Sequence, residues 1–378
     1  MSAGSHATQA DLLATAFAGL GQIVADPADL HFGLTFRIAG PPPSVAELRA
    51  RVAERVGASS PLAERLVWAE GARWERAADF DPAEHVRELG GSGPAAVRSF
   101  AALPGRPPWM LLVEPAESDW RLHYLVHHAR QDAQAALRTV VSLLGEGRTG
   151  SSAPSRPPGW WTPGSLVPGV LRTLRTGQPT AGTPDETKRE FAERVIPVSI
   201  LREVADARKI TVNQVLLSAL RRAGGPREVL MPLSIRDGAD SEFVNRIALT
   251  RVALTSDRAV RRDSRRRRVA RERQAWRLLS NGRNDRLAGW MLRRITNPAT
   301  MTATVSNLRV DERITLLGKE VLGISAIPWL PPGHRWFALL VTYLADTTLT
   351  VLAQSEADKL VDAWVSAVDD MRRREDRR

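Results

Sequence analysis

The chain has 378 residues, of which 43% are hydrophobic and 11 are tryptophan, so it is long and apolar enough for one large domain or two of ordinary size. It contains no cysteine, which excludes disulfides, thiolate nucleophiles, iron–sulfur clusters and cysteine-ligated zinc. The formal net charge is +11, but only 4 of the 53 basic residues are lysine. An arginine bias of this kind is typical of GC-rich coding, so the charge is weak evidence for a polyanionic partner, although a basic surface attracts acidic ligands.

The first 150 residues carry the hydrophobic patterns of alternating helices and strands. Residues 30–38 and 122–127 are predicted as strands from their alternating apolar side chains, and 109–114 as a buried strand from its continuous apolar run. Because only a short turn separates 109–114 from 122–127, we expect these two strands to pair antiparallel. Helices are predicted over 9–25, after the N-cap residue Ser44, and over 134–144.

Residues 145–182 differ from both flanks, because they are rich in Gly, Ser, Pro and Thr. This composition predicts a linker or crossover with one short amphipathic piece at 166–174. Beyond it, strands are predicted at 194–200, 229–235, 247–254, 302–305, 321–326, 337–343 and 347–352, and helices at 211–223, 259–279 and 356–373. The sequence therefore predicts an N-terminal α+β subdomain over 1–150, a Pro/Gly-rich linker over 151–190 and a C-terminal α+β subdomain over 191–378.

No targeting or membrane-spanning segment is predicted. Residues 1–11 are polar and lack the basic start of a secretory signal, and the apolar stretch 12–25 is interrupted by glycine and glutamine. The longest late apolar segment, 336–353, contains Asp346 and several threonines. We therefore expect a soluble, cytoplasmic protein.

Two adjacent histidines, His127 and His128, end the predicted strand 122–127, and Asp132 follows four residues after the second. A histidine at a strand end that faces a cleft can remove a proton from an alcohol or amine near neutral pH. A carboxylate four residues later can hold the turn that orients the ring. The pattern indicates general-base chemistry at His128, whereas His127 points to the opposite side of the strand and is expected to be structural.

This stretch resembles the HHxxxDG motif of the condensation-domain acyltransferase superfamily, and other motifs follow in the order of its wax ester synthase/diacylglycerol acyltransferase (WS/DGAT) branch. Each motif alone is weak, and their shared order over roughly residues 75–370 carries the resemblance. The matching segments are FDPAEHV at 80–86, LPGRPPW at 103–109, TVNQVLL at 211–217, PLSIR at 232–236 followed by Asn245-Arg246, Val305-Ser306-Asn307, and LPPG at 330–333.

The resemblance implies two chloramphenicol-acetyltransferase-like subdomains that form a V-shaped pseudo-dimer with a central tunnel. His128 would be the general base for acyl transfer from an acyl-CoA or a carrier-protein phosphopantetheinyl thioester to a hydroxyl or amine, with no metal and no bound cofactor. Asp132 would form a structural ion pair with an arginine, for which Arg236 is the first candidate and Arg246 the second. The further residues assigned to the site are Ser306 and Asn307, as possible donors to the oxyanion, and Asn213, as a helix-start amide with a possible acceptor contact.

Three positions depart from the family pattern. Ala133 replaces the motif glycine, which would cost about 1 kcal/mol if the position needs a positive φ. Gln214 replaces an aspartate, and Leu308-Arg309-Val310-Asp311 replaces a VPGP segment, so we expect a differently built loop there. These departures leave a divergent substrate pocket or a decayed enzyme as alternatives.

Nine arginines lie within residues 258–273, and acidic residues dilute this run. The favoured explanation of the run is a solvated helix face. The second is a docking site for a carrier protein or for coenzyme A phosphates, and the least favoured is a nucleic-acid-binding surface. The sequence therefore favours an O-acyltransferase, or less readily an N-acyltransferase, of specialised metabolism. Its rivals are a catalytically silent binding relative, a wax ester or triacylglycerol synthase, and a nucleic-acid-associated protein.

Overall fold

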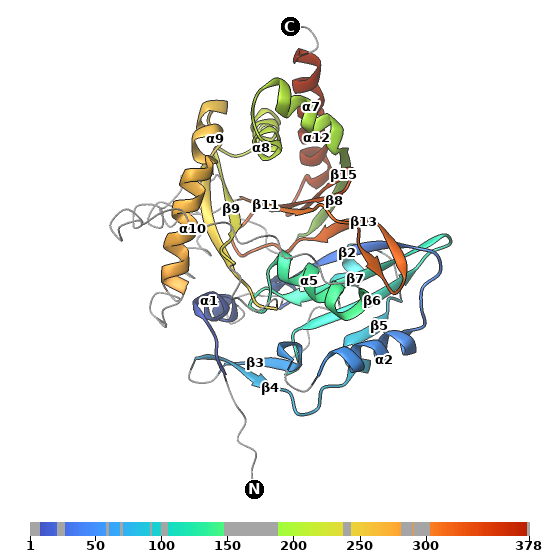
Figure 1. Cartoon of the computed structure of the whole chain (residues 1–378). Coiled ribbons are helices and arrows are strands. Elements are labelled where there is room, and N and C mark those ends of the chain that lie inside the picture. The colour runs from blue at the N-terminus through green and yellow to red at the C-terminus, as the bar shows by residue number, and fades with distance from the viewer. Residues whose placement is uncertain are drawn as a thin grey trace.

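Two six-stranded sheets form the centre of the molecule, and helices cover each of them (Figure 1). The computed structural model describes residues 8–20, 27–57, 60–68, 71–90, 93–99, 105–146, 188–236, 243–280, 290 and 303–375. The predicted linker, including its amphipathic piece at 166–174, lies outside the described residues. The described part has the α+β architecture that the sequence predicts.

The first sheet has the strand order β12-β13-β2-β7-β6-β5. As expected, β6 and β7 pair antiparallel, and β2 pairs antiparallel with the other side of β7. Helices α2 and α5 pack against this sheet and each other, and Ser44 caps α2 with a capping box as predicted. The bounds are β2 His31–Ala39, β5 Val86–Glu88, β6 Trp109–Pro115, β7 Asp119–His127, β12 Thr315–Leu316, β13 Lys319–Ile327, α2 Val45–Arg55, α3 Pro82–His85 and α5 Ala133–Leu144.

The second sheet has the order β10-β9-β11-β14-β15-β8, and its outer face carries α7, α8 and α12. Alternate residues of β14 face different cores: Ala338 and Leu340 pack with these helices, whereas Phe337 and Leu339 face the first sheet's side. The bounds are β8 Glu190–Pro197, β9 Glu228–Ser234, β10 Ile247–Ala253, β11 Ala303–Val310, β14 Trp336–Tyr343, β15 Asp346–Ala353, α7 Val198–Ala207, α8 Val212–Arg222 and α12 Ala357–Glu375.

The two sequence halves share a sheet, because β13 comes from the C-terminal half but pairs with β2. This strand crosses from one sheet to the other between β11 and β14 along the chain. The subdomain boundaries at 150 and 190 stay a prediction, and a cut there would remove both β12 and β13 from the first sheet.

Two predicted elements are corrected. The strand predicted over 194–200 ends at Pro197, and α7 begins at Val198. The single helix predicted over 259–279 is two helices, α9 (Asp257–Asp263) and α10 (Arg266–Ser280). Ser264 separates them: its Oγ donates to the Val260 carbonyl at 2.7 Å and accepts from Gln214 Nε2 at 2.9 Å, so tertiary contacts favour a turn there.

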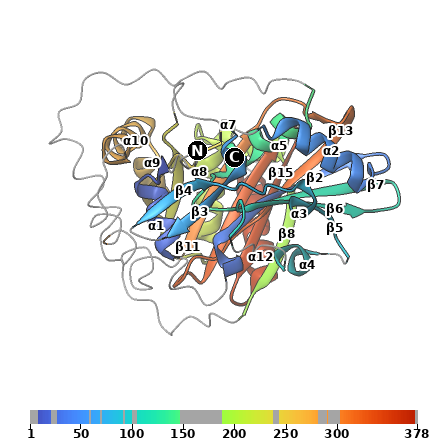
Figure 2. The same cartoon turned by 90° about the horizontal axis from the view of Figure 1, so that it is seen from below.

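A helix and a small three-stranded sheet from the first 76 residues complete the fold. Helix α1 (Leu12–Leu20) is shorter than the predicted 9–25, of which residues 21–25 lie outside the described part. In both views α9 and α10 lie on one side of the molecule with α1 nearby, away from α2 and β13 (Figures 1 and 2). The remaining elements are β1 Thr8–Gln9, β3 Glu64–Trp68, β4 Ala72–Arg76, α4 Pro94–Arg98 and the 3₁₀ turns Pro27–Leu30 and Pro61–Ala63. Within the described residues, no helix has the length and apolarity that crossing a membrane requires.

Candidate active site

His128 lies immediately after β7, at a point where two pockets meet. Its backbone N–H donates to the Leu30 carbonyl at 2.9 Å, which continues the β2–β7 ladder by one residue and fixes the position of its Cα. The residue is 8% exposed. Because its ring lines both pockets, it is buried but remains within reach of molecules that enter from either one.

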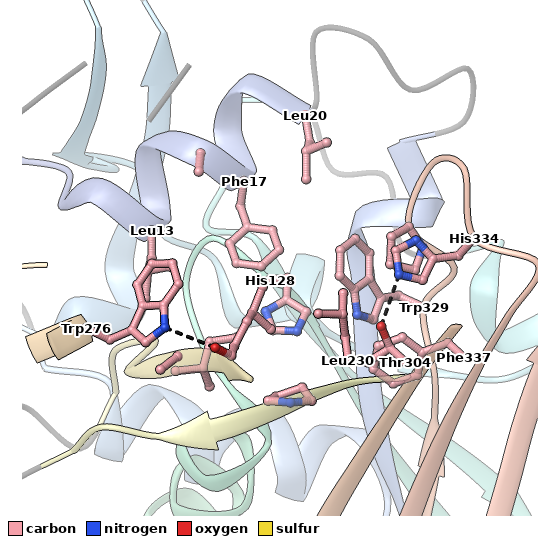
Figure 3. Close-up of a pocket in the computed structure, with 16 residues that line it drawn as sticks. Leu13, Phe17, Leu20, His128, Leu230, Trp276, Thr304, Trp329, His334 and Phe337 are labelled. Atoms are coloured by element: carbon pink, nitrogen blue, oxygen red, sulfur yellow. Dashed lines mark hydrogen bonds between the residues drawn. The ribbon is translucent and has the colours of Figure 1, made fainter. Parts of the chain in front are cut away.

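Three aromatic rings surround the imidazole of His128, and Figure 3 shows two of them, Phe17 and Trp329. Phe17 of α1 stacks on it almost parallel, with a centroid distance of 4.5 Å and an interplanar angle of 7°. Phe32 and Trp329 lie at 4.6 and 5.0 Å. Burial among these rings lowers the pKa of His128 to about 4, although its own backbone carbonyl and the Asp132 carboxylate act in the opposite direction. The ring is therefore neutral at pH 7, as a base must be.

Asn245 holds the backbone side of His128 and is a site residue to which the sequence analysis gave no role. Its Nδ2 donates to the His128 carbonyl at 2.6 Å and lies 3.2 Å from Nδ1 of the ring. Nδ1 is thus turned toward the Asn245 amide and the backbone of His128 itself, which leaves Nε2 for a substrate. The signal for Asn245 was its place directly before Arg246 in the matched motif, but only the tertiary contact reveals its partner.

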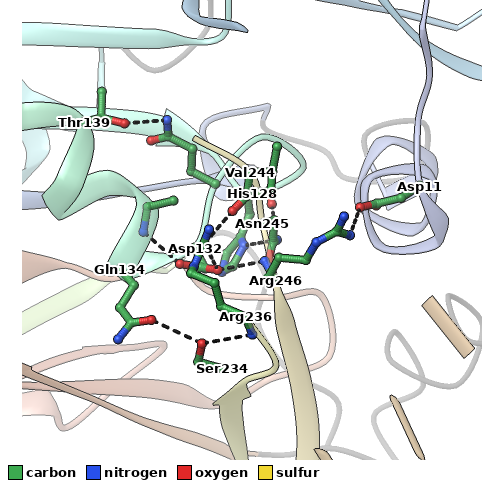
Figure 4. Close-up of polar contacts among 12 residues, drawn as sticks. Asp11, His128, Asp132, Gln134, Thr139, Ser234, Arg236, Val244, Asn245 and Arg246 are labelled. Carbon is green, nitrogen blue, oxygen red and sulfur yellow. Dashed lines mark hydrogen bonds and ion pairs between the residues drawn. The ribbon is translucent and has the colours of Figure 1, made fainter. Parts of the chain in front are cut away.

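Asp132 connects the histidine turn to the second sheet (Figure 4). It caps α5, accepting from the Ala135 backbone at 2.9 Å, and its other oxygen accepts from Arg236 Nη2 at 2.9 Å and from the Arg246 backbone N–H at 2.7 Å. Both members of the Asp132–Arg236 ion pair are almost fully buried. The structure therefore pairs Asp132 with the first of its two candidate arginines.

The second candidate, Arg246, reaches α1 instead. Its Nη1 lies 2.7 Å from Asp11, and Asp11 also accepts from the Ala14 backbone at 2.8 Å, so it caps α1. Burial raises the pKa of Asp11 above its ordinary value, which Arg246 opposes. One short segment, 244–246, thus anchors Asp132, His128 and α1 together.

Ala133 is the first residue of α5, and its φ is not among the positive values found in the described residues. The position therefore does not need glycine, and the strain considered for alanine is absent. The other two departures are also accommodated. Gln214 completes a capping box with Thr211 at the start of α8, and residues 308–310, which were expected to form a differently built loop, instead continue strand β11.

His127 does not line either pocket that His128 lines. Its Nδ1 accepts from the Ala129 backbone at 3.0 Å, and its ring lies edge-on to His31 at 5.2 Å. Burial lowers the pKa of His127 well below its ordinary value. These contacts hold the turn that carries His128.

The polar pocket, as we name the one beside Asp132, has a volume of about 280 Å³. Ser306 and Asn307, the two candidate oxyanion donors on β11, both line it. Asn213 lines neither pocket beside His128: it lies in the first turn of α8, where its Oδ1 is buried without a hydrogen-bond partner among the described residues. The other lining groups with hydrogen-bonding capacity are Asp132, Gln134, Ser234 and Arg309.

The apolar pocket, as we name the one beneath α1, has a volume of about 50 Å³. Phe17, Trp276 and Trp329 close it on different sides (Figure 3). Its two polar residues apart from His128 bond to each other, Thr304 Oγ1 to His334 Nε2 at 3.0 Å. Burial lowers the pKa of His334 to about 4, so this second imidazole is also neutral at pH 7. Phe17, Trp276 and Trp329 have no role that their sequence predicts, because only the fold brings them to His128.

The arginine run is divided between internal and exposed positions. Arg268 contacts Asp263 and Glu272, and Arg277 donates to the Ile235 and Arg236 carbonyls at 2.6 and 2.7 Å. Arg258, Arg261, Arg262, Arg265 and Arg271 are exposed. Within the run, Arg268 thus ties α10 to α9 and to the Arg251 carbonyl of β10, whereas Arg277, just beyond the run, binds the segment after β9. The five exposed arginines form a solvated face. Over the described residues, no group of three or more His, Asp or Glu side chains is arranged to hold a metal.

No protein-family model and no curated protein matches the sequence, but the fold matches solved structures over almost their whole length. The wax ester synthase/diacylglycerol acyltransferase from Marinobacter aquaeolei is 14% identical, with a TM-score of 0.61 over 97% of this chain and 100% of that one. A mutant starter condensation domain of rhizomide synthetase, in complex with C8-CoA, is 13% identical, with a TM-score of 0.66 over 98% and 95%. The first condensation domain of the CDA synthetase is 16% identical, with a TM-score of 0.64 over 98% and 96%.

At sequence identities this low, the structural similarity establishes the fold alone. The chain has the chloramphenicol-acetyltransferase-like architecture that condensation domains and a WS/DGAT protein share, as the order of its motifs predicts. The V shape and the continuous tunnel stay expectations.

Proposed function

We propose that this chain, which folds like the condensation domains, transfers an acyl group from a thioester to the hydroxyl or amine of a small molecule. One observation carries the proposal: the second histidine of the HHxxxD motif is a neutral, buried imidazole at the junction of two pockets. A base in this position can meet a thioester and an acceptor that arrive separately. The similarity to acyltransferase structures supports the same chemistry.

The reaction assigned to the site is a direct transfer. Nε2 of His128 accepts the proton of the acceptor hydroxyl while its oxygen attacks the thioester carbonyl, and Ser306 or Asn307 donates to the resulting oxyanion. Collapse of the tetrahedral intermediate breaks the carbon–sulfur bond, and the imidazolium returns the proton to the thiolate. The ester and the free thiol are the products, and no covalent acyl-enzyme forms.

The remaining assignments refine this proposal. The donor is an acyl-CoA or an acyl carrier protein, and a hydroxyl acceptor in specialised metabolism is preferred over an amine. Ala133, whose family counterpart is glycine, sits without strain at the start of α5, which supports an active enzyme over a silent relative. The exposed arginines of α9 and α10 would attract the acidic groups of either carrier.

The test is acceptor-dependent release of free thiol from acetyl-, butyryl-, hexanoyl- and octanoyl-CoA. Acceptors are 1-octanol, a phenol, glucose and octylamine, supplied one at a time. Because the chain contains no cysteine, a thiol-reactive dye reports product without background from the protein. We expect release with at least one pair and an ester or amide by mass spectrometry. Binding of the CoA thioesters without release of thiol would refute acyl transfer from CoA. The same assay with an acyl carrier protein loaded with these groups then decides: thiol release would keep acyl transfer with a carrier-protein donor, and no release would favour the silent relative.

A further inference from the structure

We infer that the apolar pocket receives the acyl group, that it admits only a short one, and that Phe17 sets this limit. The inference rests on the proposed acyl transfer and adds the class of donor to it: thioesters of acetyl to propionyl size. It follows from the volume of the pocket, the chemistry of its walls and the way in which α1 is held.

The volume limits the length of the chain. A cavity of roughly 150 Å³ accommodates benzene, which is about 25 Å³ for each carbon. The apolar pocket offers about 50 Å³, so on the same scale it holds roughly two carbons beyond the carbonyl. A longer acyl chain would have to extend out of the pocket or displace one of its walls.

The walls of the pocket suit an alkyl group over most of their surface. The side chains around the cavity are apolar except for Thr304, His128, His334 and the indole nitrogens of its two tryptophans. Thr304 Oγ1 bonds to His334 Nε2, and only His334 Nδ1 and Trp329 Nε1 are buried without a hydrogen-bond partner among the described residues of this wall. The polar pocket, with Ser306, Asn307 and Gln134, is the place for the amide and hydroxyl groups of the reactants.

Phe17 is a fixed wall. Its ring stacks on His128 at 4.5 Å and meets Trp329 edge-on at 5.6 Å, and it is 8% exposed. Helix α1 carries it, and Asp11 ties the start of that helix to Arg246. On another side, Trp276 is held by a hydrogen bond from Nε1 to the Leu249 carbonyl at 3.0 Å. Replacing the Phe17 ring by a methyl group therefore opens the pocket directly next to His128.

The experiment compares the donor chain-length profile of the wild type with that of Phe17→Ala. The matched control is Phe32→Ala, which removes the same ring from beside His128 but from a residue that lines only the polar pocket. We expect kcat/KM of the wild type to be highest for acetyl- or propionyl-CoA and about tenfold or more lower for octanoyl-CoA, since one misfitting methylene already changes specificity by about tenfold. Phe17→Ala should raise the octanoyl-to-acetyl ratio at least about tenfold, and Phe32→Ala should leave that ratio unchanged.

A wild type that prefers octanoyl-CoA, or a Phe17→Ala profile like that of the wild type, overturns the inference while acyl transfer stands. If Phe17→Ala does not fold, Leu13→Ala opens the same pocket from the preceding turn of α1. If no donor is consumed, acyl transfer fails, and the inference is judged by calorimetric binding of ethyl- and octyl-pantetheine thioethers. Selective binding of the ethyl compound supports the short pocket, and equal binding or no binding overturns it.

Discussion

The two pockets that meet at His128 differ in what they give to the same ring. The apolar pocket, built from α1, α10 and the loop after β13, contributes aromatic contacts and keeps the imidazole neutral. The polar pocket, built from β11, β9 and the start of α5, contributes charge and hydrogen bonds that orient the turn. One side therefore sets the protonation state of His128, and the other side sets its position.

The largest effect on stability should come from the polar side, through the buried Asp132–Arg236 pair. Arg236→Met leaves the Asp132 carboxylate without its guanidinium partner, and we expect a loss of about 3–5 kcal/mol in the free energy of unfolding. Denaturant titration measures this loss. Arg313→Met, which breaks the exposed pair with Glu320, is the control and should cost less than about 1 kcal/mol. Equal losses for the two variants would show that the buried pair has no special role.

The next prediction concerns the pH dependence of the reaction, which the apolar pocket sets through the pKa of His128. Because burial lowers the pKa of His128 to about 4, kcat/KM should stay level from pH 7 to about 5 and fall only as the ring becomes protonated near pH 4. Stability follows the same direction: the folded pKa lies below the unfolded value of 6.5, so stabilisation is complete above pH 6.5 and is lost as the pH falls toward 4.

Phe17→Ala should test how the apolar pocket lowers the pKa of His128, because water that reaches the exposed ring raises this pKa toward its ordinary value. The acid limb of the pH–rate profile should then move upward from about 4 toward 6.5. An acid limb already near 6.5 in the wild type would contradict the assigned burial of the ring.

The smallest effect is expected at Ala133. Since this residue begins a helix without a positive φ, Ala133→Gly should destabilise the protein by about 0.5–1 kcal/mol through the greater backbone freedom of glycine. Thermal unfolding is sufficient to measure it. A gain in stability would mean that alanine is strained in the turn after all.

The polar side was largely predictable from the sequence, and the apolar side was not. His128, Asp132 and Arg236 lie in ordered motifs, and Ser306 and Asn307 lie in the matched segment 305–307, so each could be named before the fold was known. Phe17, Trp276 and Trp329 are separated from His128 by at least 111 residues, as the chain numbering shows, and apolar side chains look alike in any core. Only the packing of α1 and α10 over the sheets makes them a pocket.

The fold divides in the same way into elements that the local sequence predicts and elements that depend on distant contacts. Alternating or continuous apolar runs identified β2, β6 and β7, and apolar periodicity, with Ser44 as N-cap for α2, identified α2 and α8, since these patterns depend on local sequence. The break between α9 and α10 depends on a hydrogen bond from Gln214, fifty residues away, and the place of β13 in the first sheet depends on pairing with β2. Contacts of this kind leave no periodic signal in the sequence.

The most direct test of the account is single-turnover transfer by His128→Ala with the donor and acceptor that the wild type uses fastest. The control is His123→Gln, which replaces another buried imidazole of β7 that bonds to Thr35 and Glu114 at 2.9 Å and lines neither pocket. We expect His128→Ala to lose about 10²- to 10⁴-fold in rate while remaining folded, and His123→Gln to retain the wild-type rate. Undiminished transfer by folded His128→Ala would contradict the central claim.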